Sequence, residues 1–129
     1  MPRQQLPRPT DAELEILNVL WMIGPATVRQ VYEAINNRRS AQYSTILKFM
    51  QIMAEKRILI RDDSERAHVY KAAQSREATQ QQLAGHLLER AFGGSAKDLV
   101  MRAVSATKAS KAELAEIRRL LDDYAKGAK

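Results

Sequence analysis

Hydrophobic residues between positions 41 and 59 recur every three or four places, which is the period of an α-helix with one buried face. They are Ile46, Phe49, Met50 and Met53. The opposite face of this helix carries Ser44, Lys48 and Gln51, whose side chains are polar and can form hydrogen bonds. A helix with an apolar back and such a front suits the major groove of DNA, but it also suits the surface of an ordinary globular domain.

Two shorter helical patterns precede this stretch. A capping box formed by Thr10 and Glu13 predicts the start of the first helix, and a Gly-Pro pair predicts its end. Thr27 is the expected N-cap of the second helix, which extends to about Ile35. A polar loop then leads to the third helix, which is predicted over residues 44–56.

A predicted β-hairpin follows the third helix. Residues 58–61 are β-prone, residues 62–66 form a polar loop, and residues 67–71 alternate between apolar and polar positions. Three helices followed by a hairpin is the order of a winged helix-turn-helix domain, in which the third helix usually enters the major groove. The predicted fold class is therefore mainly α with a small β-hairpin, and it favours the DNA-binding interpretation without establishing it.

Three more helical patterns form a tail, and Ser75, Ser95 and Ser110 are their expected N-caps. Their apolar stripes are larger than three short helices can bury among themselves, so a homodimer interface is expected. The alternative is that the tail folds onto its own N-terminal domain. The expected dimerisation residues are Leu83, Leu87, Leu88, Phe92, Leu99, Val100, Val104, Leu114, Ile117, Leu121 and Tyr124.

These patterns divide the chain into three regions. Residues 1–9, which include three prolines, are expected to form a flexible N-terminal arm. Residues 10–74 form the predicted winged-helix DNA-binding domain, and residues 75–129 form the helical dimerisation region. A symmetric dimer would match the two half-sites of a palindromic operator in double-stranded DNA.

Basic residues cluster around the third predicted helix. Between Arg29 and Arg61 there are seven cations and two acids, in a chain of net charge +6. Such a bias is compatible with a polyanionic partner. The absence of cysteine excludes disulfides and thiolate metal sites and favours a cytoplasmic location. Neither the longest apolar run nor the N-terminus suits a membrane segment, so no membrane insertion is expected.

Four residues on or beside the polar face of the third helix are candidates for reading DNA bases. Glutamine can pair with adenine through two hydrogen bonds, and lysine can reach guanine. Hydroxyl groups near the start of the helix can also meet phosphate, and the alternative role of Ser44 is a simple N-cap. The candidates are Ser44, Thr45, Lys48 and Gln51.

Five further residues are candidates for contacts with the DNA backbone. They are Arg38, Arg39, Tyr43, Arg66 and His68. The first two directly precede the third helix, where phosphate contacts would hold it in register; alternatively they are solvated surface charges. The alternative for Tyr43 is an aromatic residue packed in a loop, and for His68 a partly buried strand residue.

No motif in the sequence predicts an enzyme, a metal site or a cofactor. The two histidines, His68 and His86, do not lie at the spacing of metal ligands. The sequence contains neither a glycine-rich phosphate-binding motif nor the motifs of zinc peptidases and serine hydrolases. Two other non-enzymatic functions stay open. One is an activator or ligand-responsive regulator, which would need an apolar cavity; the other is a winged-helix protein-interaction module, whose third helix would be more apolar or acidic.

Four segments of the chain resemble the BlaI/MecI-type penicillinase-repressor family. They are ELEILNVLW at 13–21, YSTILKFMQIMAEKRIL at 43–59, RAHVYKA at 66–72 and AFGGSAKDLVMRAV at 91–104. They occur in the family order, and the similarity extends from about Pro9 to Tyr124. The resemblance implies a winged-helix DNA-binding domain, a helical dimerisation tail and repression at promoter operators. It also implies that a membrane sensor-protease, a metallopeptidase, relieves repression and that the repressor is cut.

The chain departs from the family pattern at three points. The bond that is cut in lactam-responsive members joins an Asn to a Phe, but the matching residues here are Arg102 and Ala103, so the resemblance is weakest at this bond. The copper-responsive branch has a Cys-rich tail, which this chain lacks. The family usually has Gly after the recognition helix, where this chain has Arg57; a left-handed conformation there would cost about 1 kcal/mol or more.

Overall fold

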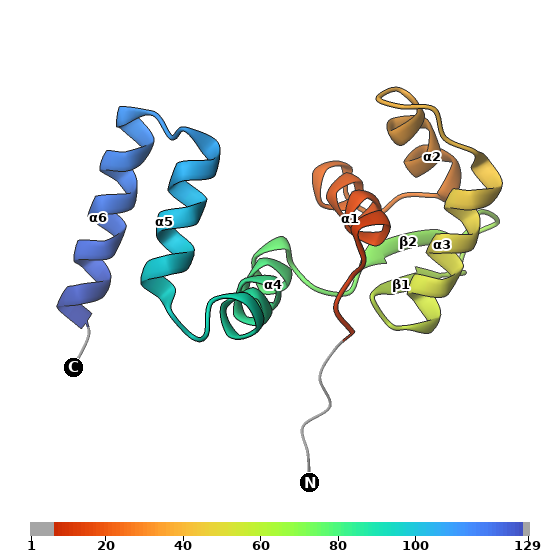
Figure 1. Ribbon diagram of the computed structural model, residues 1–129. Coiled ribbons are helices and arrows are strands. Elements are labelled where there is room, and N and C mark those ends of the chain that lie inside the picture. Colours follow the sequence, from red (N-terminus) through yellow and green to blue (C-terminus); the bar gives the residue numbers. More distant parts are fainter. Residues whose placement is uncertain (1–6, 128–129) are drawn as a thin grey trace, which may run out of the picture. The chain divides into compact units, whose positions relative to one another are not determined.

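The computed structural model describes residues 7–127 of the chain (Figure 1). The chain divides into two compact units, of which the first ends at Ala84 and the second begins at Gly85. The division falls within helix α4 (Arg76–Ala91), whereas the sequence predicts a boundary after residue 74. Each unit is described separately below.

Before α4 begins, the first unit contains three helices and two strands in the predicted order, which confirms the predicted fold class (Figure 1). They are α1 (Asp11–Ile23), α2 (Val28–Asn36), α3 (Tyr43–Glu55), β1 (Leu59–Asp62) and β2 (Val69–Ala72). The capping box of α1 is present. Thr10 Oγ1 accepts a hydrogen bond of 3.2 Å from the Glu13 N–H, and Glu13 Oε1 accepts one of 2.9 Å from the Thr10 N–H. Thr27 and Gln30 repeat this arrangement at the start of α2.

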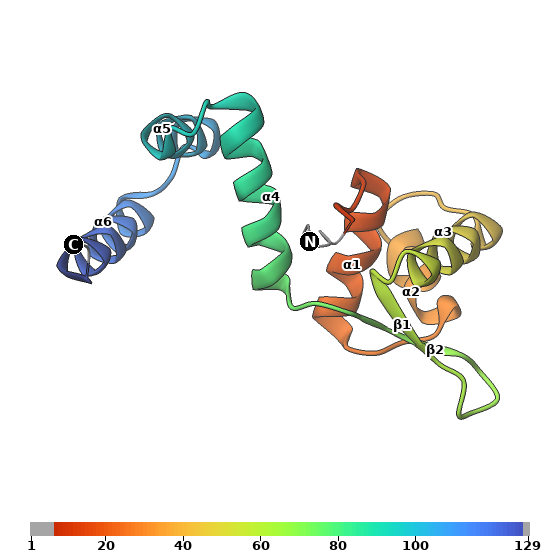
Figure 2. The same ribbon diagram turned by 90° about the horizontal axis from the view of Figure 1, so that it is seen from below.

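The two strands form an antiparallel hairpin in which Leu59 lies opposite Ala72. The predicted second strand begins at residue 67, but β2 begins at Val69, so the loop between the strands is longer than predicted. This loop projects away from the helices of the unit (Figure 2). The hairpin is also joined to the turn between α1 and α2. The Ala26 N–H donates to the Tyr70 carbonyl at 2.9 Å, and the Tyr70 N–H donates to the Ala26 carbonyl at 2.8 Å.

A mainly aliphatic core holds the helices and the hairpin together. Its buried residues are Ile16, Leu17, Val19, Leu20, Ala26, Val28, Val31, Ile35, Ile46, Met50, Met53, Ile58, Leu59 and Tyr70. Removing these side chains from water is the main driving force for folding of the unit. Trp21 adds a polar tie, because its Nε1–H donates to the Gln74 carbonyl at 3.1 Å. Pro9, at the end of the predicted arm, is buried; residues 1–6 of that arm lie outside the described residues.

The second unit contains the end of α4 together with α5 (Ala96–Thr107) and α6 (Lys111–Gly127). The predicted N-caps of the tail helices are confirmed. The side-chain oxygens of Ser75, Ser95 and Ser110 each accept a hydrogen bond from the backbone N–H three residues later. Within the described part of this unit, no residue of α5 or α6 is buried. Across positions 7–127, no helix has both the length and the apolar character that crossing a bilayer requires.

Candidate nucleic-acid interface

Helix α3 presents the predicted reading face to solvent. Its buried residues are Ile46, Met50 and Met53. Ser44, Lys48 and Gln51 are exposed on the opposite side, on successive turns of the helix. The structure therefore brings these three predicted side chains together on one exposed face.

The start of α3 contradicts the alternative interpretation of Ser44 as a simple N-cap. The N-cap is Gln42, and its side chain makes no capping hydrogen bond. Ser44 thus lies within the first turn, and its interpretation as an N-cap is wrong. Thr45 is exposed beside Ile52, at the flank of the reading face rather than at its centre.

Tyr43, the first residue of α3, belongs to a small exposed cluster with two residues of α2. Its ring meets the ring of Tyr32 edge-on, with the centroids 5.7 Å apart and the planes at 76°. The guanidinium carbon of Arg29 lies 4.7 Å from the Tyr43 centroid and 5.9 Å from the Tyr32 centroid. Stacking on these two rings restrains the Arg29 side chain close to the start of α3. The sequence prediction missed Arg29, although its i, i+3 spacing with Tyr32 signals a shared helix face.

Arg39, in the loop before α3, is bound by α1. Its Nε donates to Glu15 Oε1 and Oε2 at 3.2 and 2.9 Å, and its Nη2 donates to Oε1 at 2.6 Å. Its Nη1 donates to the Ser40 carbonyl at 3.0 Å. The hydrogen bonds from Arg39 lower the pKa of Glu15, with a smaller contribution from the charge of Arg38, and Glu15 raises the pKa of Arg39 in return. The sequence did not predict this partner for Arg39.

A second glutamate of α1 reaches the other end of α3. Glu13 is 2% exposed, and its Oε2 accepts a hydrogen bond of 2.9 Å from Nζ of Lys56, the C-cap residue of α3. Burial alone would raise the pKa of Glu13. The hydrogen bond from the Thr10 N–H and the ion pair with Lys56 outweigh burial, so the pKa of Glu13 lies below its ordinary value.

The hairpin loop carries its own network of charges. Asp63 Oδ1 lies 2.9 Å from Arg61 Nε and 2.7 Å from His68 Nδ1. His68 precedes β2 and is exposed, so its interpretation as a partly buried strand residue is wrong. Arg66 is exposed in the same loop. Of the predicted backbone contacts, Arg38 and Arg66 are thus exposed without an ion pair in the described structure, whereas Arg39 and the His68 imidazole each lie beside a carboxylate.

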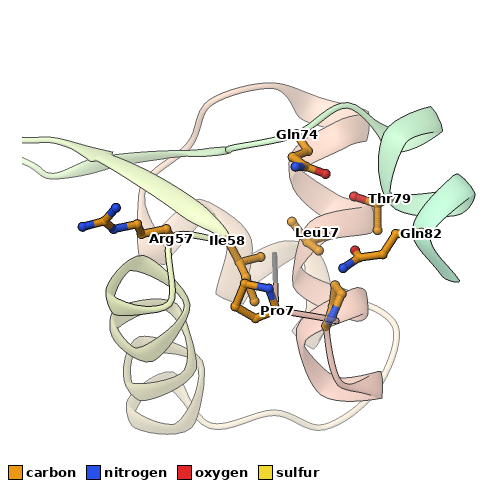
Figure 3. A pocket seen from close by; sticks show the side chains of 8 residues that line it. Pro7, Leu17, Arg57, Ile58, Gln74, Thr79 and Gln82 are labelled. Atoms are coloured by element: carbon orange, nitrogen blue, oxygen red, sulfur yellow. The ribbon is translucent and has the colours of Figure 1, made fainter. Parts of the chain in front are cut away.

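One small cavity lies inside the first unit. Figure 3 shows Leu17 of α1, Ile58 before β1 and Thr79 of α4 on its walls, with Pro7 at its edge. Its volume is about 20 Å³, enough for roughly one water molecule. Sites for small molecules usually measure about 300–1,000 Å³. This cavity has no room for such a molecule. A larger, open hollow of about 870 Å³ lies at the surface between the C-terminal end of α3 and β1, where Gln51 and Ile60 line it.

The tail helices expose much of the predicted dimerisation stripe. The exposed members of that stripe are Leu87, Val100, Leu114, Leu121 and Tyr124. Leu121 is 54% exposed and Tyr124 is 80% exposed. Met101 and Leu120 are exposed as well, and neither is in the predicted set. The other predicted members are half-buried.

Comparisons with known proteins agree on one family. A model of the penicillinase repressor family matches residues 9–123. The penicillinase repressor of Staphylococcus aureus is 23% identical over 115 residues, which are 89% of this chain and 91% of that protein. The transcriptional regulator BlaI of Mycobacterium tuberculosis (strain ATCC 25618 / H37Rv) is 35% identical over 74 residues, or 57% of this chain. That match spans 54%, about half, of the mycobacterial protein.

A solved structure has the same fold as the first part of the chain. It is the solution structure of the DNA binding domain of the repressor BlaI, which matches with a TM-score of 0.50 and 22% sequence identity. The match covers 57% of this chain and 90% of that chain. This likeness concerns the fold, whereas the family match over residues 9–123 covers most of the chain and shows the family. The chain belongs to the penicillinase repressor family.

Proposed function

We propose that the chain is a transcriptional repressor that binds double-stranded operator DNA through α3. The observation that carries this proposal is the exposed polar face of α3, with Lys48 at its centre, opposite a face on which Ile46, Met50 and Met53 are buried. Lys48 is a cation between two hydrogen-bonding side chains, Ser44 and Gln51, which is the chemistry that base edges in the major groove require. Membership of the penicillinase repressor family supports the same role.

The proposed contacts fall into two groups. The base-reading residues are Ser44, Thr45, Lys48 and Gln51, and the backbone contacts are Arg38, Tyr43, Arg66 and His68. Arg39, the fifth residue predicted to contact the backbone, is paired with Glu15 and is not included. Arg29 joins the second group, because it is stacked on Tyr43 at the start of α3. Phosphate contacts of this kind fix the register of the helix, while the α3 side chains supply sequence preference. The ion pair of Arg39 with Glu15 sets it apart from the other cations.

The proposal includes a homodimer formed through the tail. Exposed apolar side chains on α5 and α6 leave a hydrophobic face without cover in the described part of the second unit. A second copy of the same tail would cover it, and large exposed apolar patches commonly mark such interfaces. Two α3 helices related by a two-fold axis would then meet the half-sites of a palindromic operator.

The release step of the proposal is proteolysis that depends on a membrane metallopeptidase sensor. The bond between Arg102 and Ala103 lies within α5, and both residues are exposed. Cutting there would detach α6, with its apolar face, from the DNA-binding unit. Co-expression of the chain with such a sensor, followed by mass spectrometry, tests this step: a shortened fragment is expected, and its mass shows whether the cut lies at Arg102–Ala103 or elsewhere. An intact chain under inducing conditions would contradict the step.

A mobility-shift assay with footprinting on the DNA upstream of the chain's own gene tests DNA binding. We expect a protected palindrome whose occupancy falls steeply as salt rises, because phosphate contacts release counterions. A library of random duplexes offers a second search for the preferred sequence. Failure to bind either DNA at low salt would reject the repressor and favour a protein-interaction module.

A further inference from the structure

Two acidic side chains of α1 hold the two ends of α3. Glu15 binds Arg39, in the loop that leads into the helix, and Glu13 binds Lys56, at its C-cap. We propose that these two glutamates are positioning residues for DNA recognition. Their role would be to fix the orientation of α3, although neither lies on that helix. This inference rests on the proposed function. It adds a role in DNA recognition for two residues that are negatively charged, as DNA itself is.

The geometry at Arg39 argues for positioning. The Nε, Nη1 and Nη2 atoms of Arg39 all donate within the protein, two to the Glu15 carboxylate and one to the Ser40 carbonyl. Three of the five guanidinium N–H donors are thus used within the protein, and the Glu15 carboxylate offsets the charge of Arg39, so this arginine is a weaker phosphate ligand than an unpaired one. Because Ser40 precedes Ala41 and the N-cap Gln42, this network attaches the start of α3 to α1.

The hydrogen bond from Lys56 to Glu13 attaches the C-terminal end of α3 to α1. The Glu13 carboxylate is buried and already accepts the capping hydrogen bond of α1 from Thr10. A buried carboxylate with two fixed donors has one orientation, so it holds the Lys56 ammonium in place. The two attachments are only two residues apart on α1, and they reach α3 from opposite ends. Rotation or sliding of α3 against α1 would stretch at least one of them.

The proposal predicts a change in DNA affinity that is opposite to the usual effect of removing a negative charge. Removing an acidic charge from a DNA-binding surface ordinarily strengthens binding, because the repulsion of phosphate falls. If Glu15 positions α3, however, Glu15→Gln should weaken binding to the preferred sequence. Binding to unrelated DNA depends on charge more than on the angle of α3, so it should stay equal or rise. The ratio of specific to non-specific affinity should therefore fall.

The experiment uses the full chain and the duplex that the wild type enriches most from a random library, with an unrelated duplex as the non-specific probe. Glu15→Gln, Arg39→Gln and the double variant form a double-mutant cycle. Glu33→Gln, on an exposed residue of α2, removes the same charge and is the matched control. We expect either single variant to lose about three- to tenfold in specific affinity, which is less than the loss of a base contact. The double variant should lose no more than either single variant.

Each outcome decides the proposal. The proposal is overturned if Glu15→Gln binds the preferred duplex as tightly as the wild type or more tightly. Additive losses in the cycle would also overturn it, because Arg39 would then act on phosphate independently of Glu15. A fall in thermal stability that accounts for the lost binding, with an unchanged specificity ratio, would also overturn it. A wild type that enriches no duplex would reject the proposed function itself. The exposed Glu15–Arg39 pair is used because its variants should fold, and Lys56→Gln repeats the test at the other end of α3.

Discussion

The amide of Ile58 donates a hydrogen bond of 2.9 Å to the carbonyl of Met53, and this bond closes the C-terminus of α3. A second hydrogen bond joins the residues between these two: the Arg57 N–H donates to the Ala54 carbonyl at 3.1 Å. These two bonds form a Schellman motif, in which the residue after the C-cap must be left-handed. That residue is Arg57, with φ of 67°. Ile58 and Met53 are both buried, so the apolar contact that usually accompanies the motif is available as well.

Replacing Arg57 with glycine should stabilise the first unit. Glycine reaches the left-handed region without the Cβ clash that arginine suffers there. Part of this gain is lost because glycine is more flexible in the unfolded chain. We expect the free energy of unfolding in urea to rise by about 1 kcal/mol.

The matched control is Arg57→Ala. Alanine also removes the arginine side chain, but it keeps the Cβ atom and therefore the strain. If both variants gained the same stability, the gain would come from losing the side chain, and the left-handed strain would not be its cause.

Lys48→Ala should reduce both affinity and selectivity for the preferred DNA. Lys48 is exposed at the centre of the reading face, so the variant removes a base contact without disturbing the core. The expected loss is ~1–3 kcal/mol in binding free energy, together with a relaxed preference at one base pair. Fluorescence titration with the preferred duplex and its single-base variants measures both effects. Lys126→Ala, which removes the same charge from α6, should leave the base preference unchanged.

Tyr43→Phe should weaken DNA binding without altering sequence preference. The variant keeps the ring that packs against Tyr32 and Arg29, and it removes only the hydroxyl that is proposed to meet a phosphate. A hydrogen bond of this kind contributes about 1 kcal/mol. Tyr32→Phe removes the neighbouring hydroxyl and is the control. Equal affinity of both variants and the wild type would leave Tyr43 as a packing residue that supports Arg29.

Leu121→Glu should convert the proposed dimer to a monomer. A charge in the middle of an apolar interface loses its hydration without gaining a partner. Because Leu121 is already 54% exposed in a single chain, the variant should leave the helices of each unit intact. Sedimentation and circular dichroism report the two effects. Ala115→Glu introduces the same charge on the opposite face of α6 and should stay dimeric; a dimeric Leu121→Glu would move the interface elsewhere.

The sequence predicted those features that depend on neighbouring residues. The capping box at Thr10, the N-cap at Thr27 and the buried face of α3 involve positions within a turn or two of each other, so a local pattern is enough. The left-handed conformation of Arg57 came instead from the resemblance, because the family usually has Gly at this position, and the structure shows it with φ of 67°.

The sequence did not predict features that join distant segments. Lys56 pairs with Glu13 across 43 positions, and Arg39 pairs with Glu15 across 24. Over such separations in sequence, any glutamate could pair with any lysine or arginine. No spacing rule therefore selects the correct pair. The backbone bridge between Ala26 and Tyr70 is hidden in the same way. At the candidate site, the side chains of the reading face were thus predictable, but the contacts that orient it were not.

Glu13→Gln should lower the stability of the first unit in a manner that depends on pH. The folded-state pKa of Glu13 is below its ordinary value of 4.5, because the Thr10 N–H and Lys56 favour the ionised form over the opposing effect of burial. The ionised carboxylate therefore contributes stability that is fully present above the unfolded-state pKa. This contribution is lost as the pH falls through the lower folded-state pKa. Glutamine keeps an oxygen for the Thr10 N–H but has no charge for Lys56.

Urea unfolding of the wild type and Glu13→Gln from about pH 7 to about pH 3 measures this contribution. Near neutrality the wild type should be more stable by about 1 kcal/mol, since a charged hydrogen bond to Lys56 is replaced by a neutral one. The two stability curves should approach each other as the pH falls below the unfolded-state pKa and through the lower folded-state pKa, because the wild-type carboxylate becomes protonated and then resembles the amide. Glu33→Gln, at an exposed site on α2, controls for the change in net charge. A difference that stayed constant across this range would show that the shape of the Glu13 side chain stabilises the unit, and that its charge does not.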